Sequence, residues 1–197
     1  MRIIAGRWGG RRLPAVRETG VRPTTDRVRE ALMSALGARG LIEGANVLDL
    51  FCGSGALGLE ALSRGATGAR FVDKQRSLLR TITDFSRELD PDISVETQSL
   101  DLLSNPAKAA SAIAAQTRLE LGYSLVFADP PYADLAKLPS LLAALRTQGL
   151  LAPESAVIVE HSSRDAAIEV SGFRSLATYQ YGDTGVILFE NENEAYS

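Results

Sequence analysis

Between Asn46 and Gly58 an apolar, strand-like run passes directly into a glycine-rich turn and the start of a helix. Gly53 and Gly55 let the backbone turn tightly and let a ligand lie against it, and Gly58 lets the helix approach the strand. Further strand-like runs near 69–72, 93–97, 124–128 and 156–160 alternate with helical segments near 56–64, 75–89, 104–116 and 134–147. This alternation predicts an α/β fold, with a mostly parallel sheet covered by helices on both faces.

Both ends of the chain depart from this alternation. Segments 176–181 and 186–190 are rich in β-forming residues and flank a Gly-Asp-Thr-Gly turn, which predicts an antiparallel hairpin at the sheet edge. Residues 2–16 suit a short strand pair, and a helix is expected to begin after the N-cap candidates Thr24, Thr25 and Asp26 and to end near 37–40. We therefore expect a basic N-terminal extension over 1–43, a core over 44–190, and a disordered tail over 191–197.

The composition restricts the class of protein. With 197 residues, 45% of them hydrophobic and 23% charged, the chain suits one globular domain with a short appendage. No apolar run approaches the ~20 residues of a membrane-spanning helix, and the first residues do not resemble a secretory signal. Cys52 is the sole cysteine and His161 the sole histidine, which excludes an internal disulfide and a Cys/His zinc site. We expect a cytoplasmic, monomeric protein with no membrane segment and no metal.

Charge is distributed unevenly along the chain. The net charge is −3, yet residues 1–39 hold nine arginines against three acidic residues, a local charge of +6 that leaves −9 for the remainder. Arginine is well suited to phosphate because its planar guanidinium donates two parallel hydrogen bonds. The segment predicts a basic face for a polyanion, although an arginine-rich solvated surface is the alternative. The expected contacts are Arg2, Arg7, Arg11, Arg12, Arg22, Arg27 and Arg29.

The glycine turn and its neighbours predict a cofactor site. The spacing Gly53, Gly55 and Gly58 fits a dinucleotide turn, and Asp73 follows Gly53 by 20 residues, where a carboxylate can hold ribose hydroxyls. Asp49, however, would repel a pyrophosphate and attract a sulfonium and an ammonium. This charge pattern favours S-adenosylmethionine. The alternative is that the glycines only form a turn and that Asp49 is a buried capping carboxylate.

We expect the cofactor to be bound by Asp49, Phe51, Gly53, Ser54, Gly55, Asp73, Lys74 and Leu100. The adenine ring should meet a residue that follows the third strand. Ser99, Leu100 and Asp101 all occupy that position, and the sequence does not choose among them. Cys52 is interpreted as a small residue that fills space beside the turn.

The run Asp129-Pro130-Pro131-Tyr132 follows a buried strand. In a doubly wound sheet the fourth strand pairs with the first, so Asp129 should project from the same edge as the glycine turn. Hydrogen bonds from an exocyclic base amine to the Asp129 carboxylate and the Pro130 carbonyl would orient the amine lone pair. Tyr132 could stack on a base that has left its helix. His161, after the fifth strand, is expected to have a structural or rim role.

With these motifs in place, the chain resembles the RsmD family of bacterial small-subunit rRNA guanine-N2 methyltransferases. The resemblance includes R-I-I-A-G from Arg2, G-R-R-L from Gly10, R-P-T-T-D-R-V-R-E-A-L from Arg22, D-L-F-C-G-S-G-A-L-G-L-E-A-L-S-R-G-A from Asp49, and D-P-P-Y. It implies a Rossmann-like class I S-adenosylmethionine-dependent methyltransferase with a seven-stranded sheet. It also implies that the substrate is one guanine of 16S rRNA, in the small ribosomal subunit or its assembly intermediate. Many relatives have Asp or Asn where Ser99 falls.

Three other functions remain open. A methyltransferase acting on DNA adenine or protein glutamine would share D-P-P-Y, but the short chain leaves little room for an added recognition domain. A nicotinamide-dependent oxidoreductase would share the glycine spacing but not Asp49 or D-P-P-Y. An RNA-binding module without catalysis would need only the arginine-rich segment.

Overall fold

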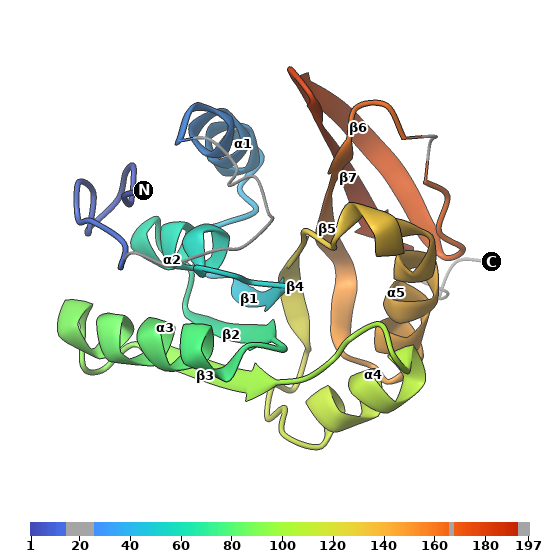
Figure 1. The fold of residues 1–197 in the computed structure, drawn as a ribbon, viewed down its shortest axis with the longest axis horizontal. Coiled ribbons are helices and arrows are strands. Elements are labelled where there is room, and N and C mark those ends of the chain that lie inside the picture. Colours follow the sequence, from blue (N-terminus) through green and yellow to red (C-terminus); the bar gives the residue numbers. More distant parts are fainter. Residues whose placement is uncertain (15–25, 166–167, 193–197) are drawn as a thin grey trace. The chain divides into compact units, whose positions relative to one another are not determined.

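The computed structural model describes residues 1–14, 26–165 and 168–192. The chain divides into two compact units, Met1–Ser99 and Leu100–Ser197, and each is described by itself. Figure 1 shows the elements of both units, coloured along the sequence. Thr24 and Thr25, the expected N-cap candidates, and residues 193–197 of the expected tail lie outside the described ranges.

The first unit contains three parallel strands in the order β3-β2-β1. They are β1 (Asn46–Leu50), β2 (Gly68–Asp73) and β3 (Ser94–Ser99), and they are joined by helices α2 (Ala56–Ser63) and α3 (Arg76–Leu89). Helix α1 (Asp26–Ala38) precedes them. β2 is buried along its whole length, as expected for a strand covered on both faces. The amphipathic α3 buries its apolar residues, among them Leu78, Ile82 and Phe85.

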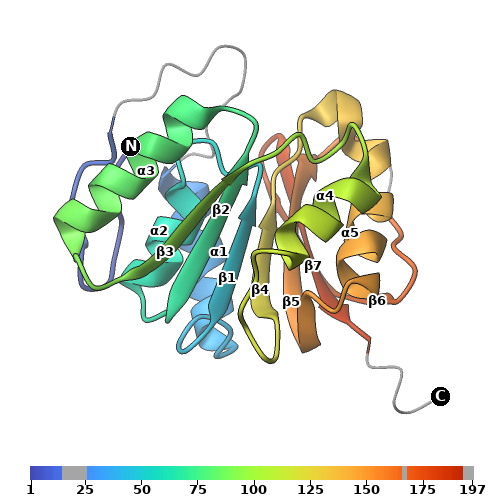
Figure 2. The same ribbon diagram turned by 90° about the horizontal axis from the view of Figure 1, so that it is seen from below.

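The second unit contains four strands in the order β4-β5-β7-β6. β4 (Tyr123–Ala128) and β5 (Leu151–Ser162) are parallel, and β6 (Phe173–Tyr181) and β7 (Thr184–Asn191) form the expected antiparallel hairpin. Helix α4 (Pro106–Ala114), the 3₁₀ turn η1 (Tyr132–Lys137) and helix α5 (Leu138–Thr147) complete the unit. Figure 2 shows α4 and α5 side by side on one face of these strands.

The strand expected near 156–160 extends over Leu151–Ser162, and two helices differ from their expected bounds for local reasons. The segment expected as one helix over 134–147 is divided into η1 and α5, since Pro139 has no N–H to donate to an interior helical hydrogen bond. The helix expected over 104–116 starts at Pro106 instead, because the Asn105 side chain caps it by accepting a hydrogen bond from the Lys108 N–H at 3.0 Å.

The described chain ends are tied to the units. Of the strand pair expected over 2–16, the described residues 1–14 show one antiparallel bridge, between Arg2 and Arg12. At the other end, β7 continues one residue past the expected core limit, because the buried Asn191 side chain donates to the Ala152 carbonyl at 3.0 Å. The described part of 1–43 belongs to the first unit. Its role as a separate RNA-contacting extension stays a prediction.

Candidate active site

The turn between β1 and α2 requires glycine for steric reasons. Gly53 and Gly55 adopt φ of 50° and 73°, in the left-handed region. A Cβ at Gly55 would lie 2.8 Å from Ile82 Cδ1 and 3.2 Å from Phe71 Cε1. Phe51, a non-glycine residue, also adopts a positive φ of 58°, so the backbone is strained where the strand ends. The sequence therefore commits this segment to a tight turn.

Asp49 lies beneath this turn. Its side chain is buried, and its Oδ2 accepts a hydrogen bond from the Gly58 N–H at 2.9 Å. Gly58 is required at this position, since a Cβ there would lie 2.5 Å from Phe71 Cε1 and 2.9 Å from the same Asp49 oxygen. The observed contact matches the alternative interpretation of Asp49 as a buried capping carboxylate, and a part in cofactor binding stays a prediction.

The environment of Asp49 disfavours its negative charge. The pKa of the Asp49 carboxyl is raised to about 8, chiefly because burial disfavours the charged form and also through the nearby Asp73 charge, against the Gly58 N–H, which favours the anion. Burial and the same two carboxylates raise the pKa of the Cys52 thiol well above its usual value. Cys52 is buried. A thiol of this kind is a filler residue rather than a nucleophile.

Asp73 joins the end of β2 to the glycine turn. Its Oδ2 accepts from the Gly53 N–H at 3.0 Å, and its Oδ1 accepts from the Gln75 N–H at 2.8 Å. Each carboxylate oxygen has a second lone pair, so both can accept another hydrogen bond. Asp49, Gly53 and Asp73 are thus brought together at one end of the first unit, and their binding of a cofactor stays a prediction.

Within the described part of the chain, the remaining cofactor candidates, Lys74, Leu100 and Asp101, have no contact that points to a ligand-binding role. Lys74 is exposed, and its carbonyl accepts from Ser99 Oγ at 3.3 Å. Leu100 is half-buried. The Asp101 carboxylate accepts from the N–H groups of the two residues Leu103 and Ser104 at 3.2 and 3.1 Å, so it closes its own turn. The choice among the three adenine candidates stays open.

Ser54 adds a contact within the glycine turn. Its hydroxyl lies 3.6 Å from the Met1 sulfur, so the first residue of the chain reaches the turn.

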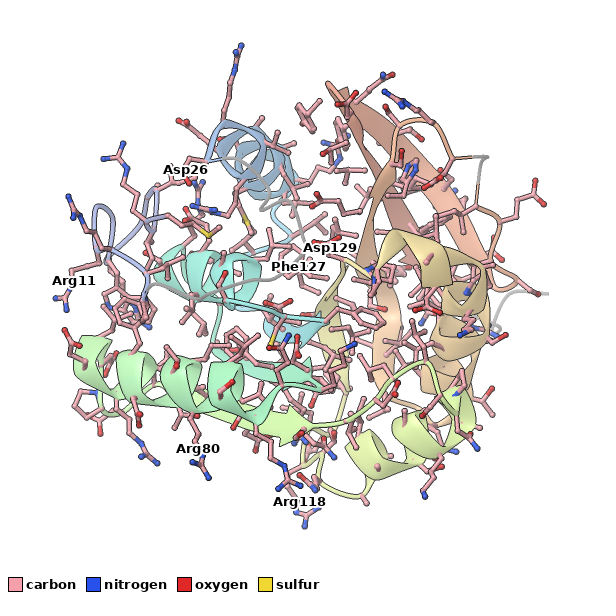
Figure 3. The ribbon with its side chains drawn as sticks, viewed as in Figure 1. Arg11, Asp26, Arg80, Arg118, Phe127 and Asp129 are labelled. Carbon is pink, nitrogen blue, oxygen red and sulfur yellow. The ribbon has the colours of Figure 1, made fainter. Side chains whose placement is uncertain are left out.

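In the second unit, Asp129 follows the last residue of the buried strand β4 (Figure 3). Asp129 is half-buried, and Pro130 is buried. Pro131 precedes η1 with φ −53° and ψ 131°, and its carbonyl accepts from the Asp134 N–H at 2.8 Å. Tyr132 begins η1. A carboxylate and two prolines therefore form a stiff turn directly after a strand, as the motif predicted.

His161 packs against a glycine on the neighbouring strand. It pairs with Gly185 of β7, where a Cβ would lie 2.5 Å from the imidazole ring. Its Nδ1 lies 2.8 Å from the Ser162 carbonyl oxygen, and the ring is buried. These contacts agree with a structural role.

A buried glutamate in α2 anchors the N-terminal segment, and the sequence analysis missed it. Glu60 accepts from the Ile4 N–H at 2.7 Å and the Ala5 N–H at 3.0 Å, and it pairs with Arg64 at 2.8 Å. One helical turn later, Ser63 Oγ accepts from the Trp8 N–H at 3.0 Å. A charged residue inside the otherwise apolar run of α2 was the available signal.

Arg29 corrects one of the RNA contacts expected from the sequence. Its side chain is fully buried, pairs with Asp26 at 3.1 Å, donates to the Arg2 carbonyl at 2.5 Å and lies 4.0 Å from Glu60. Because its guanidinium faces the interior of the first unit, the expectation that Arg29 contacts RNA is wrong.

The other arginines remain candidates. Arg2, Arg7, Arg11, Arg12 and Arg27 are exposed. Figure 3 shows the Arg11 side chain pointing outward, where it pairs with Glu88 of α3 at 2.6 Å, and Arg7 pairs with Asp90 at 3.2 Å. Arg22 lies outside the described residues.

Among residues 1–14, 26–165 and 168–192, no three His, Cys, Asp or Glu side chains are grouped so that they could hold a metal ion. In the same part of the chain, every helix is too short or too polar to cross a bilayer.

The chain matches known proteins along nearly its whole length. The family model described as "Conserved hypothetical protein 95" matches residues 1–190. "Putative rRNA methyltransferase YlbH" of Bacillus subtilis is 35% identical over 191 residues, covering 96% of this chain and 98% of that protein. "Ribosomal RNA small subunit methyltransferase D" of Escherichia coli is 38% identical over 162 residues, covering 81% of this chain and 74% of that protein.

Solved structures of methyltransferases also match the fold of this chain. "Putative methyltransferase yhhF" from Escherichia coli has a TM-score of 0.77 at 34% identity and covers 98% of both chains. The rRNA methyltransferase aviRa from Streptomyces viridochromogenes, at 16% identity and a TM-score of 0.65, shares the fold. The predicted fold class, seven mostly parallel strands with an antiparallel C-terminal hairpin in a Rossmann-like methyltransferase fold, is confirmed.

Proposed function

Because the chain belongs to the conserved hypothetical protein 95 family, with relatives named as rRNA methyltransferases, we propose that it methylates rRNA from S-adenosylmethionine. The proposed acceptor is the exocyclic N2 amine of one guanine in 16S rRNA, within the small ribosomal subunit or its assembly intermediate. The protein would act in the cytoplasm as a monomer, without a metal. The observation that carries the chemistry is the half-buried Asp129 with its two prolines at the end of the buried strand β4.

The residues of the first unit fit the cofactor. Gly53 and Gly55 contribute no side chains to the turn before α2, and Cβ atoms at Gly55 and Gly58 would clash with core residues of the unit, among them Phe71. Asp73 stands at the end of β2 with spare lone pairs for ribose hydroxyls. When bound, S-adenosylmethionine supplies a methyl group on a positively charged sulfur, which a nitrogen lone pair can attack.

Asp129 and Pro130 would act on the acceptor amine. The amine is a poor nucleophile since its lone pair is delocalised into the base. The Asp129 carboxylate and the Pro130 carbonyl would each accept one N–H, which directs the lone pair toward the methyl group. Tyr132 would stack on the base once it has left its helix. Accepting both N–H groups also excludes acceptors that lack an amine.

The exposed arginines of the first unit would hold the rRNA by its phosphates. Arg2, Arg7, Arg11, Arg12 and Arg27 are exposed, and the planar guanidinium suits phosphate oxygens. Arg11 is paired with Glu88 of α3 and Arg7 with Asp90 just after that helix, so both would exchange those partners for phosphate. Arg22 is proposed as a further phosphate contact because it lies in the arginine-rich segment of the sequence.

The experiment supplies labelled S-adenosylmethionine with unmodified small subunits, free 16S rRNA and DNA, and maps the labelled base. We expect one labelled guanine in the subunit. Asp129→Asn should reduce kcat by about 10²-fold or more, the usual cost of removing a transition-state contact of this kind, while cofactor binding by calorimetry is unchanged. Asp134→Asn, a nearby carboxylate paired with Lys137, is the matched control and should remain active.

Labelling of DNA adenine instead of rRNA, or full activity of the Asp129→Asn variant, would overturn the proposal.

A further inference from the structure

Two tyrosines on the edge strand β6 have no part in the chemistry proposed above. The rings of Tyr179 and Tyr181 are stacked, with centroids 6.3 Å apart and planes 13° from parallel. Both are half-buried, while Thr178 and Gln180 between and beside them are exposed. Because side chains alternate along a strand, the two tyrosines share one face of the sheet. The Tyr179 hydroxyl is buried, and the part of the pair that stays exposed at the sheet edge is a surface on which another flat ring can stack.

The strand register aligns this pair with the D-P-P-Y turn. Ala128 pairs with Val159, so Asp129 is level with Glu160. Glu160 pairs with Val186 on β7, and Val186 pairs with Tyr179 on β6. Asp129 and Tyr179 therefore stand in one row, three strand spacings apart. At roughly 4.8 Å per spacing, about 14 Å separates them across the second unit.

The face that carries the pair is the one opposite α5. Asn191 on β7 accepts a hydrogen bond from Arg146 of α5 at 3.1 Å, which identifies the α5 face. Val186 is five residues from Asn191, an odd number, so its side chain points to the other face, together with Tyr179 opposite to it. Figure 2 shows α4 and α5 gathered on the other face of these strands. On the tyrosine face Val186 and Leu188 of β7 are fully buried, so the accessible part of this face lies at the edge strand β6, where Tyr179 and Tyr181 are half-buried.

The charge of the second unit determines which part of an RNA can bind there. Residues 100–197 contain six Lys and Arg against twelve Asp and Glu, whereas residues 1–99 contain fifteen against twelve. Three of the six basic side chains, Lys137, Arg164 and Arg174, already pair with carboxylates. Phosphates would be repelled by this unit, but a base presents an uncharged ring, and stacking does not depend on net charge.

We propose that Tyr179 and Tyr181 form a stacking ledge for one unpaired base of the RNA, close in sequence to the methylated nucleotide. This inference rests on the proposed function. A stacked strand advances about 3.4 Å per nucleotide, so the ledge would take a base within roughly four nucleotides of the target. Basic groups of the first unit would then hold phosphates, while the second unit recognises unstacked bases at two points, Asp129 and the ledge.

The test combines protein variants with RNA lacking single bases. The variants are Tyr181→Leu, which removes the ring, Tyr181→Phe, which keeps it, and Gln180→Ala, an exposed neighbour on the same strand. Each is assayed for KM and kcat on unmodified rRNA fragments in which one nucleotide at a time, up to four on either side of the target, is abasic. Thermal unfolding checks that the variants are folded.

We expect Tyr181→Leu to raise KM about 10-fold with little change in kcat, because the variant loses one base stack. The Phe variant and the Gln180→Ala control should match the wild type. One abasic position should raise the wild-type KM by a similar factor and add nothing further to the Leu variant. Losses that simply add at every position, or a wild type indifferent to all abasic sites, would overturn the ledge.

Binding provides a readout that is independent of methyl transfer. A 2-aminopurine placed in turn at each position of the RNA fragment should lose fluorescence at one position on binding the wild type and the Phe variant, and should keep it there with the Leu variant. If the wild type transfers no methyl group to any RNA, the proposed function fails, whereas the quenching still tests the ledge. If the wild type methylates RNA and the fluorophore is equally quenched by all variants, the ledge alone is wrong.

Discussion

Replacing Gly58 by alanine tests the steric argument at the centre of the cofactor turn. Gly58 lies in the first turn of α2, where an added Cβ would meet Phe71 Cε1 at 2.5 Å, Phe71 Cζ at 2.8 Å and Asp49 Oδ2 at 2.9 Å. Phe71 is fully buried, and Asp49 nearly so. Neither neighbour can move without disturbing the core of the first unit.

The loss of folding stability expected for Gly58→Ala is the sum of three contributions. Overpacking a core by one methyl group costs ~1–3 kcal/mol. Loss of the Gly58 N–H to Asp49 hydrogen bond costs a further ~0.5–1.5 kcal/mol, the range for a neutral acceptor, which applies because the raised pKa of Asp49 keeps the carboxyl protonated at pH 7. The greater helix propensity of alanine returns ~1 kcal/mol. The expected net destabilisation is about 0.5–3.5 kcal/mol.

Gly37→Ala is the matched control, since Gly37 lies in α1 and a Cβ there meets nothing within 4 Å. It should be neutral or stabilise by up to ~1 kcal/mol. Urea denaturation followed by circular dichroism compares the two variants, and calorimetry measures S-adenosylmethionine binding, which Gly58→Ala should weaken. Equal stability of the two variants, with unchanged cofactor affinity, would refute the packing argument.

Three further predictions concern charged groups. The pKa of Asp49 is about 8 in the folded protein and 3.8 in the unfolded chain. Between these pH values the folded protein binds one more proton than the unfolded chain at this residue. The free energy of unfolding should therefore fall as the pH rises from 4 to 8. Asp49→Asn should flatten that slope in urea titrations at several pH values; an unchanged slope would contradict the assignment. Glu60→Gln should destabilise by ~3–5 kcal/mol by breaking a buried ion pair, and should speed hydrogen exchange at the Ile4 amide, measured by NMR. Replacing exposed Arg11 and Arg12 by alanine should lower the slope of log K against log salt by ~0.7–0.9 per lost phosphate contact in RNA filter binding, whereas Arg174→Ala should leave it unchanged.

Elements with strong local signals could be predicted from the sequence. The strand before Gly53, the amphipathic helix over 75–89 and the C-terminal hairpin were all found within a few residues of their observed bounds. The predicted resemblance to the RsmD family is confirmed by the match to a small-subunit methyltransferase D. These features depend on neighbours in sequence, such as apolar spacing, glycine and motif order.

The division after Lys137 could not be found in the same way. Residues 134–147 carry a helical pattern, and only the backbone around Pro139 separates the 3₁₀ turn from α5. A proline is tolerated in the first turn of a helix, so its presence fixes a start without saying how the preceding residues are arranged.

What the sequence determined by itself is the kind of chemistry: a glycine turn after an acidic strand, a carboxylate with two prolines after another, and a cluster of arginines. What only the tertiary structure decided is which of these ionisable side chains face inward. Arg29 is buried against Asp26 and Glu60, and Asp49 is bonded to the Gly58 N–H. A charge is tolerated inside a protein only when partners are supplied, and here partners such as Glu60 lie tens of residues away in the chain, so burial follows from folding and not from local composition.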